Sequence, residues 1–389
     1  MQSGIFSIQA QERIVFGTPS PEAVAAEAEY FDAKRVFVTS TRSLAVLSDG
    51  PLQRVEQALG SRHCGTFSTI SAHSPLEDVI AAANTARAVK ADLIVAIGGG
   101  SVIDASKVVQ LCLWQTIDNV NDLRPYAAGN QWSQGSALNV PADAIRMVAV
   151  PTTLSAADFT SLAGITDKSA GTKLAFKHRS LVPRSVVLDP EATLNTPDWL
   201  LFSTGIRAVD HAVESYCCPQ ANLATETLSL RGLTLLSDSL RKLMAHPEDL
   251  QARMTAQFGM WHAIWPATSG IYHGASHGIG YALGAGFGIP HGHTSCVMLP
   301  AVLQWNAEVN GDRQKAVADA IGNSDIPAWK GIRELIASVG MPCTLRDVGI
   351  TRGNLDEIAQ RALEYQPVLL NPRPIKEQKD VMEILELCY

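Results

Sequence analysis

The first half of the chain alternates short apolar runs with amphipathic stretches. Continuous runs of aliphatic and β-branched residues occupy positions 36–39, 93–97, 147–150 and 186–188. Runs of this kind are typical of parallel strands that are covered on both faces. Apolar residues recur at helical spacing in residues 22–31, 75–89 and 104–113. The pattern therefore predicts β-α-β units and a Rossmann-like, doubly wound parallel sheet in an α/β domain.

After Asp189 and Pro190 the strand pattern stops. Helical spacing continues through residues 205–217, 224–244, 250–265, 312–320 and 330–339. We predict a dinucleotide-binding α/β domain over residues 1–190 and an all-helical (all-α) catalytic domain over residues 191–389. Two domains suit this length, because single hydrophobic cores stop growing at about 250–300 residues. The polar stretch 118–139 is interpreted as a loop between a helix and a strand.

Composition excludes several classes of function. The net charge is −7, and no cluster of Lys and Arg offers the basic surface that a nucleic-acid partner requires. No apolar stretch reaches the roughly 18 residues of a membrane span, and the N-terminus lacks the pattern of a signal peptide. We therefore expect a cytoplasmic protein. The seven cysteines lack the paired spacing of a zinc site and are expected to be reduced, mostly buried thiols.

A glycine-rich turn is the strongest local signal for ligand binding. Gly98, Gly99, Gly100 and Ser101 follow a predicted strand directly and precede a helix that is expected to open at Asp104. Glycines let backbone N–H groups approach a pyrophosphate, and the helix N-terminus favours negative charge. A tight turn without a ligand is the alternative, but the order of strand, glycines and helix favours a nucleotide site.

A second loop is expected at the same edge of the sheet. Thr152 and Thr153 follow the predicted strand 147–150 and Pro151. In open α/β sheets, ligands bind outside the carboxyl ends of the strands. The two hydroxyls are therefore predicted to face the same crevice as the glycines, although this sequence is also common in turns and helix caps.

The helical half carries two concentrations of polar residues. Arg207, Asp210, His211 and Glu214 are spaced i, i+3, i+4 and i+7, so they share one face of a helix. Such a stripe is either a solvated helix face or part of a site. Further along, seven glycines lie between residues 274 and 292. His273, His277, His291 and His293 lie in or beside this stretch, whose backbone freedom suggests a ligand-facing or metal site.

Taken together, these motifs resemble the iron-containing alcohol dehydrogenase family along nearly the whole chain. The resemblance is carried by Gly98 to Ser101 with Asp104 and Lys107, by Pro151-Thr152-Thr153, by Asp189-Pro190, and by His277 with Pro290-His291-Gly292. Within the family the maleylacetate reductases are the most similar. Membership implies a dehydroquinate synthase-like fold, NADH or NADPH as cofactor, a homodimer, and a role in the catabolism of aromatic compounds.

The family holds a metal ion with an Asp and three His, and the resemblance places Arg207 where that Asp would be. His211, His277 and His291 fall on the three histidine positions, so they would hold a metal if one is bound. Tyr281 occupies the place of a further active-site His. A guanidinium has no lone pair to donate and would repel a divalent cation. We therefore predict a site without metal.

Arg207 suggests the kind of substrate. A guanidinium can hold a carboxylate with two parallel hydrogen bonds, or stabilise charge that develops on a carbonyl oxygen. The resemblance therefore implies an anionic oxo acid as the small-molecule carboxylate partner. The alternative is that Arg207 only pairs with Asp210 or Glu214 along the helix, which contributes a few tenths of a kcal/mol.

The resemblance also implies further contacts to the cofactor. Ser40 stands where many family members have an acid for the adenosine ribose, so NADPH is expected to be tolerated beside NADH, with Arg42 two residues on. Lys173 matches a lysine of the family that contacts the cofactor. Asp158 stands where maleylacetate reductases usually have Glu, which leaves its contact undecided.

The leading hypothesis is an NAD(P)H-dependent reductase of a maleylacetate-like acid, with product of the 3-oxoadipate type. Hydride delivered to the conjugated C=C leaves enolate charge, and one of four side chains supplies the proton: Arg207, His211, His277 or Tyr281. We expect substrate to bind in the cleft between the domains. The alternatives are a metal-dependent alcohol or aldehyde dehydrogenase, a catalytically retired nucleotide-binding module, and a lyase like the sugar-phosphate cyclases, which keep a metal.

Overall fold

The computed structural model describes residue 6, residues 8–128 and residues 138–389. Residues 129–137 of the predicted loop lie outside this part of the chain. The chain divides into two compact units, Gln9–Thr196 and Pro197–Tyr389, the latter together with the N-terminal residues up to Ile8. The division follows Thr196, six residues beyond the predicted boundary.

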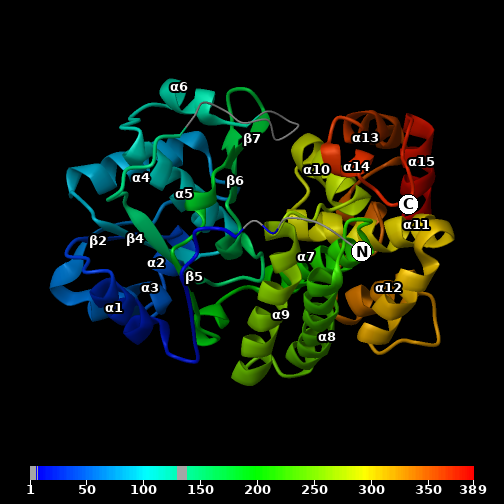
Figure 1. The fold of residues 1–389 in the computed structure, drawn as a ribbon, viewed down its shortest axis with the longest axis horizontal. Helices are drawn as coiled ribbons and strands as arrows, with labels where there is room; N and C mark the ends of the chain where they lie inside the picture. The colour runs from blue at the N-terminus through cyan, green and yellow to red at the C-terminus, as the bar shows by residue number, and fades with distance from the viewer. Residues whose placement is uncertain (1–5, 7, 129–137) are drawn as a thin grey trace. The chain divides into compact units, whose positions relative to one another are not determined.

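The first unit holds a parallel sheet of six strands in the order β1-β8-β5-β4-β2-β3 (Figure 1). Its strands are β1 (Arg13–Phe16), β2 (Val36–Thr39), β3 (His63–Phe67), β4 (Leu93–Gly98), β5 (Arg146–Pro151) and β8 (Ser185–Leu188). The strands β6 (Leu162–Asp167) and β7 (Thr172–Lys177) form a separate antiparallel pair. The parallel, doubly wound sheet is the fold class that the apolar runs predict.

Helices cover both faces of this sheet, which is why its central strands are buried throughout. Along β4, Ile94 and Ala96 pack with α4 (Leu76–Ala88) and α5 (Gly100–Trp114). Leu93, Val95 and Ile97 face the other way, in one cluster with residues of α1 (Ser20–Tyr30) and α3 (Pro51–Leu59). Successive side chains of a strand point to opposite faces, so each face receives every second residue. The short helices α2 (Arg42–Ala45) and α6 (Val120–Leu123) complete the unit.

Four strands are absent from the sequence prediction, and composition explains three of them; β1 contains the short apolar run Ile14-Val15-Phe16, which the prediction omits. The edge strands β1 and β3 are only partly buried, and β3 reads His-Cys-Gly-Thr-Phe, without an apolar run. The hairpin of β6 and β7 is likewise half-buried and rich in polar residues. Strands at an edge need apolar residues on one face at most, so a search for continuous apolar runs misses them.

The second unit is all-helical in the part that the structure describes, as predicted. Its helices are α7 (Asp198–Cys217), α8 (Leu223–Ala245), α9 (Leu250–Thr268), α10 (Ala275–Phe287), α11 (His291–Ala320), α12 (Ala328–Ser338), α13 (Leu355–Ala362), α14 (Gln366–Leu369) and α15 (Gln378–Leu387). Helix α7 is central, since it packs against α8, α9 and α11 and buries nearly every residue from Leu201 to Ser215. Among the described residues, no helix is both long enough and apolar enough to cross a membrane.

Several helices of this unit differ from the sequence prediction: α7 begins at Asp198 rather than at residue 205, and α13, α14 and α15 have no predicted counterpart. Helix α11 begins at His291 rather than near residue 312, and a non-helical residue, Asn310, kinks it. The glycine-rich stretch before it forms helix α10, so the interpretation of these glycines as backbone freedom is wrong. A Cβ on Gly278 would lie 2.4 Å from Cγ2 of Val368, and one on Gly292 would lie 2.6 Å from the backbone of Ser203. The glycines allow neighbouring segments to approach closely, which a helical pattern of large residues would not show.

Helices α8 and α9 lie side by side in Figure 1, and their close packing also requires glycine at the contact. A Cβ on Gly232 would lie 2.8 Å from the backbone N of Ala263 and 3.0 Å from the carbonyl O of Gly259. Backbone atoms cannot move aside as the end of a side chain can, so the helices would have to separate.

We expect Gly232→Ala to destabilise the protein by about 1–3 kcal/mol through overpacking. The matched control is Gly311→Ala in α11, where a Cβ would meet nothing within 4 Å. That control should be neutral or up to about 1 kcal/mol stabilising, because Ala favours the helix over Gly. Thermal and denaturant unfolding of both variants measures the difference, and equal effects would show that the close approach is unimportant.

Candidate active site

The glycine turn and the threonine loop lie side by side at the carboxyl edge of the sheet. Strand β4 pairs with β5 so that Gly98 lies opposite Pro151, and the backbone N of Thr152 donates to the carbonyl of Gly98. Helix α5 begins at Gly100, four residues earlier than predicted. The adjacency of the two loops follows the prediction, and Asp104 lies inside the helix rather than at its start.

The glycines are needed because the threonine loop closes down on them. A Cβ on Gly99 would lie 2.9 Å from Cγ2 of Thr153, and one on Gly100 would lie 3.0 Å from Oγ of Ser155. The hydroxyls of Thr153 and Ser155 are buried and have no hydrogen-bond partner in the described part of the chain. Buried polar atoms are nearly always paired, so these two hydroxyls fit a ligand at the N-terminus of α5. The residues present therefore fit the phosphates of a dinucleotide.

Ser101, the second residue of α5, is tied to a strained loop. Its Oγ accepts a hydrogen bond from the backbone N of His73 at 3.1 Å, and its carbonyl accepts one from Oγ of Ser74 at 2.7 Å. His73 and Ser74 both have positive φ, at 64° and 50°. Because the Ser101 hydroxyl accepts from a backbone N–H, its own hydrogen remains available to donate to a phosphate oxygen. Lys173 lies on the hairpin strand β7, and its charge contributes to lowering the pKa of His73, after burial.

Two of the predicted cofactor residues are engaged within the domain. Oγ of Ser40 donates to the carbonyl of Ile97 at 2.9 Å and is fully buried. The carboxylate of Asp104 lies 3.1 Å from Nζ of Lys107 and accepts from the backbone N of Gly164 at 3.0 Å. These contacts join strands and tie the hairpin to α5. They do not present either side chain to a ligand.

Asp158 is a buried carboxyl without a hydrogen-bond partner on either side-chain oxygen among the described residues. Burial raises its pKa to about 7, although its own backbone N–H and the nearby Lys107 oppose the shift. Nζ of Lys107 donates to Asp104, Thr160 and Leu162 instead. The carboxyl thus lies in the threonine loop with both oxygens available to a donor.

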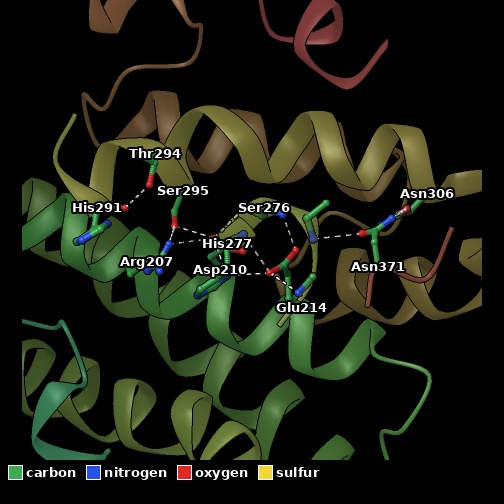
Figure 2. Close-up of polar contacts among 12 residues, drawn as sticks. Arg207, Asp210, Glu214, Ser276, His277, His291, Thr294, Ser295, Asn306 and Asn371 are labelled. Atoms are coloured by element: carbon green, nitrogen blue, oxygen red, sulfur yellow. Dashed lines mark hydrogen bonds and ion pairs between the residues drawn. The ribbon is translucent and has the colours of Figure 1, made fainter. Parts of the chain in front are cut away.

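In the second unit, the polar stripe of α7 is buried rather than solvated. Arg207 is 9% exposed, Asp210 0%, His211 6% and Glu214 7%. Figure 2 shows Arg207, Asp210 and Glu214 along α7, with α10 and α11 supplying the groups they contact. The interpretation of this face as a solvated surface is therefore excluded.

Arg207 and Asp210 share a hydroxyl from α11. Nη1 of Arg207 donates to Oγ of Ser295 at 2.9 Å, and that Oγ donates to Oδ2 of Asp210 at 2.6 Å. Oγ of Ser276 donates to the same oxygen at 2.8 Å. The direct distance from Nη1 to Oδ2 is 3.9 Å, so the opposite charges meet mainly through Ser295. Burial raises the pKa of Asp210, and the charge of Arg207 opposes this shift.

Glu214 joins α7 to the start of α10. Its carboxylate accepts from the backbone N–H groups of Gly274 at 2.9 Å and Ser276 at 2.8 Å, and from Nδ1 of His277 at 2.8 Å. It thus satisfies backbone donors that a helix N-terminus leaves free. Burial and the nearby Asp210 raise the pKa of Glu214. Because Nδ1 of His277 is bound to this carboxylate, the ring orientation is fixed and Nε2 points away.

Three imidazole rings lie against one another. His273 stacks on His277 with ring centroids 3.9 Å apart, and His211 lies 5.0 Å from both. Burial, together with the charge of Arg207, lowers the pKa of all three, that of His273 to about 3. The rings are therefore neutral at physiological pH. Nδ1 of His211 and Nε2 of His273 and His277 are buried without a hydrogen-bond partner in the described chain.

Tyr281 and His291 form the other side of the same cluster. The Tyr281 ring meets the rings of His277 and His291 edge to face, each at 6.3 Å, and the Arg207 guanidinium lies 5.8 Å from its centroid. Burial raises the pKa of Tyr281, so the phenol keeps its proton at neutral pH. The structure thus brings together all five side chains that the sequence nominated for catalysis: Arg207, His211, His277, Tyr281 and His291.

Potential metal ligands gather in two groups, and the Arg207 charge lies beside both of them. Within the described residues, potential ligand atoms lie within 4.8 Å of one another in two groups, His211 with His273 and His277, and Asp210 with Glu214 and His277. Imidazole lone pairs lie in the ring plane, and the planes of His273 and His277 are inclined by only 22°. Two such stacked rings cannot both aim at one ion about 2.1 Å away. The carboxylates of the second group already accept several hydrogen bonds, and His291 is in neither group.

His273 is the residue that the sequence nomination omits. The sequence shows His273 as one of four clustered histidines. The family motif begins at His277, however, so the resemblance assigns no role to His273. It lies before α10, although its spacing of four residues from His277 was a signal in the sequence that could have linked the two. Ser276 and Ser295 were also missed, because a lone serine in a helix carries no signal of a buried network.

Comparison with known proteins agrees with this architecture. The family model of the Fe-containing alcohol dehydrogenase C-terminal region matches residues 201–389, and that of iron-containing alcohol dehydrogenase matches residues 11–190. Dehydrogenase FUM7 of Gibberella moniliformis is 32% identical, over 96% of this chain and 95% of the relative. A maleylacetate reductase of Sphingobium indicum is 30% identical, over 94% of this chain and 92% of its own.

Among solved structures, maleylacetate reductase from Rhizobium sp. strain MTP-10005 has a TM-score of 0.83 at 25% identity, and covers 100% of this chain and 99% of its own. The two family models together account for both units, and the relatives match along nearly their full length. The chain therefore belongs to the iron-containing alcohol dehydrogenase family, in its maleylacetate reductase-like branch, and is an NAD(P)-dependent oxidoreductase.

Proposed function

We propose that this enzyme reduces an anionic, unsaturated oxo acid of the maleylacetate type with NADH or NADPH, and that it does so without a resident metal ion. The observation that carries the proposal is Arg207, a buried guanidinium beside three neutral imidazoles. Relatives named maleylacetate reductase support the substrate class, since they match nearly the whole chain.

Arg207 is free to bind a carboxylate because its charge is only loosely compensated. The nearest carboxylate oxygen, on Asp210, lies 3.9 Å from Nη1, beyond direct hydrogen-bond distance. Ser295 occupies one of the five N–H donors of the guanidinium. A planar acid can therefore take two of the remaining donors, and a buried, charge-assisted pair of this kind is stronger than one in water.

The bound nicotinamide supplies the hydride, and the side chains stabilise and protonate the product. Charge that develops on the substrate oxygen lies close to a fixed positive group, which needs no reorganisation during the reaction. Tyr281 keeps its proton because burial raises its pKa, and it lies next to Arg207. His277 is held in one orientation by Glu214. Tyr281 is therefore placed to donate the proton that completes the reduction, whereas neutral His277, whose Nδ1–H is bound to Glu214, presents Nε2 as an acceptor that can hold a proton.

The proposal for the cofactor includes both NADH and NADPH. Ser40 stands at the carboxyl end of β2 and is turned inward to the carbonyl of Ile97. No acidic side chain follows it directly, and Arg42 at the start of α2 is exposed. A 2′-phosphate therefore meets no carboxylate at these positions and has a guanidinium nearby.

The competing function is a metal-dependent alcohol or aldehyde dehydrogenase. The grouping of His211, His273 and His277 within 4.8 Å is the observation in its favour. The stacked ring planes and the adjacent guanidinium count against it, because Arg207 acts on the same nitrogens that a cation would need.

Replacement of Arg207 tests the role of the guanidinium. We expect Arg207→Met to lower kcat/KM for an oxo acid by about a hundredfold or more, as when a preorganised charge donor is removed. Because the change leaves Asp210 buried without a counter-charge, Arg207→Met with Asp210→Asn serves as a matched control for stability. Steady-state oxidation of NADH and separate titration of NADH binding provide the measurements. Unchanged kinetics in both variants would remove Arg207 from the mechanism.

Metal analysis and chelation test the proposal that the enzyme works without a resident metal ion. Protein purified without chelator should contain far less than one Fe, Zn or Mn ion per chain by mass spectrometry of the elements. Its activity should be unaffected by dialysis against EDTA, because the Arg207 charge opposes a cation at the imidazoles and the stacked rings of His273 and His277 do not converge on one ion. Activity that disappears with EDTA and returns with Fe²⁺ would establish the competing function instead.

The Thr153 hydroxyl tests the position of the cofactor. Thr153→Val keeps the side-chain volume and removes the buried Oγ1 that lacks a partner. We expect the Kd for NADH to rise roughly tenfold, the cost of one hydrogen bond to a charged group. Thr227→Val is the control, because that hydroxyl donates only to the carbonyl of Leu223 in its own helix. Fluorescence titration of both variants that gave the same Kd would mean that the phosphates bind elsewhere.

A further inference from the structure

His273 occupies a position that packing alone does not explain. It precedes α10, and its ring stacks on that of His277 with centroids 3.9 Å apart, while the ring of His211 lies 5.0 Å from both. A phenyl ring would fill the same space and stack equally well. Stacking thus accounts for the ring, but not for its two nitrogens.

Three ring nitrogens of this histidine cluster are buried without hydrogen-bond partners among the described residues. Nε2 of His273 is buried and has no hydrogen-bond partner among the described residues, and the same holds for Nε2 of His277 and Nδ1 of His211. Buried polar atoms without a partner are rare in folded proteins, and each one is costly. Three of them in one cluster indicate that a polar ligand completes their hydrogen bonds.

The chemistry of the surrounding groups restricts what that ligand can be. A cation is repelled by Arg207, whose charge acts on all three rings. An apolar group would leave the nitrogens without partners. A neutral imidazole carries one N–H, and that of His277 is bound to Glu214, so Nε2 of His277 only accepts. Nε2 of His273 can donate to a carboxylate, carbonyl or enolate oxygen that the guanidinium also binds. The cluster therefore suits a ligand with more than one oxygen-bearing group.

We propose that His273 is a further substrate-binding residue, which donates from Nε2 to a second carboxylate of the substrate while Arg207 holds the first. This inference rests on the proposed function, whose maleylacetate-type substrate has two carboxylates, and it assigns the second of them to His273. His273 then determines specificity for the substrate and takes no part in transferring the hydride or the proton.

Three substitutions separate the nitrogen from the ring. His273→Gln places an amide nitrogen near the position of Nε2, His273→Asn places one near Nδ1, and His273→Phe keeps only the stacking ring. We expect KM for an oxo dicarboxylate to rise about tenfold in the Phe and Asn variants, as for the loss of one charge-assisted hydrogen bond, and to stay within about threefold in the Gln variant. In all three variants kcat and the KM for NADH should change little, since binding alone is affected.

An oxo monocarboxylate of the same chain length is the substrate control. Its KM should be equal in the wild type and in His273→Phe, because it lacks the group that His273 holds. A rise in KM that is the same for both substrates, or a Phe variant whose KM for the dicarboxylate stays at the wild-type value, would overturn the proposal. If His273→Phe does not fold, the comparison of Gln with Asn decides the question.

Binding of adipate, an inert dicarboxylate, keeps this test independent of turnover. Calorimetry on the wild type saturated with NADH should show one adipate site, with affinity about tenfold lower in His273→Phe and unchanged in His273→Gln. An enzyme that turns over no oxo acid contradicts the proposed function, whereas adipate still reports on His273. Absent adipate binding, or equal affinity in the wild type and the Phe variant, would refute the role of His273.

Discussion

The buried charge of Arg207 is the constraint on which the site depends. A guanidinium in a helical core is stable only if neighbouring groups offset its desolvation, and here the offset is indirect. Ser295 connects it to Asp210, and Ser276 connects Asp210 to α10. Burial lowers the pKa of the three adjacent imidazoles, and the same positive charge adds to that shift. Arg207 thus favours anions and also contributes to keeping its neighbours neutral.

The hydrogen bonds of Asp210 and Glu214 also hold helix α7 against the start of α10. Both carboxyls come from α7, and both are held by groups at the start of α10. Two buried carboxyls this close repel each other, and burial raises the pKa of each. The hydrogen bonds from backbone N–H groups and serine hydroxyls hold them in place. The orientation of His277 is therefore coupled to the docking of one helix on another.

The sequence predicts those parts of this fold whose signal is local. Continuous apolar runs found the central strands, and helical spacing found α8, α9 and α12 to within two or three residues at each end. The edge strand β3 and helix α10 escaped detection, because a half-buried strand and a helix packed through glycines lack the expected periodicity. The domain division follows Thr196 because six further residues, which include a short 3₁₀ turn at Glu191–Thr193, belong to the first unit.

The residues of the candidate site are likewise predictable only where a local spacing or motif relates them. Arg207, Asp210, His211 and Glu214 were linked by their spacing on one helix, and the family motif added His277, Tyr281 and His291. His273 lies outside both patterns and joins the cluster only through the chain's path before α10. The inward turn of Ser40 and the ties of Asp104 to the hairpin were equally hidden, because hydrogen bonds between distant segments leave no trace in a linear pattern.

Gly278 of α10 and Gly292 of α11 have a consequence for how this enzyme can diverge. Gly278 and Gly292 lie against Val368 and Ser203 at distances that leave no room for a methyl group. Substitutions there would move these two helices, which carry His277 and His291, so changes of substrate range must arise elsewhere. Position 273, which precedes α10 and is only partly buried, can accept new side chains without disturbing the helix contacts. Directed evolution toward new acids would accordingly concentrate its useful mutations at such positions.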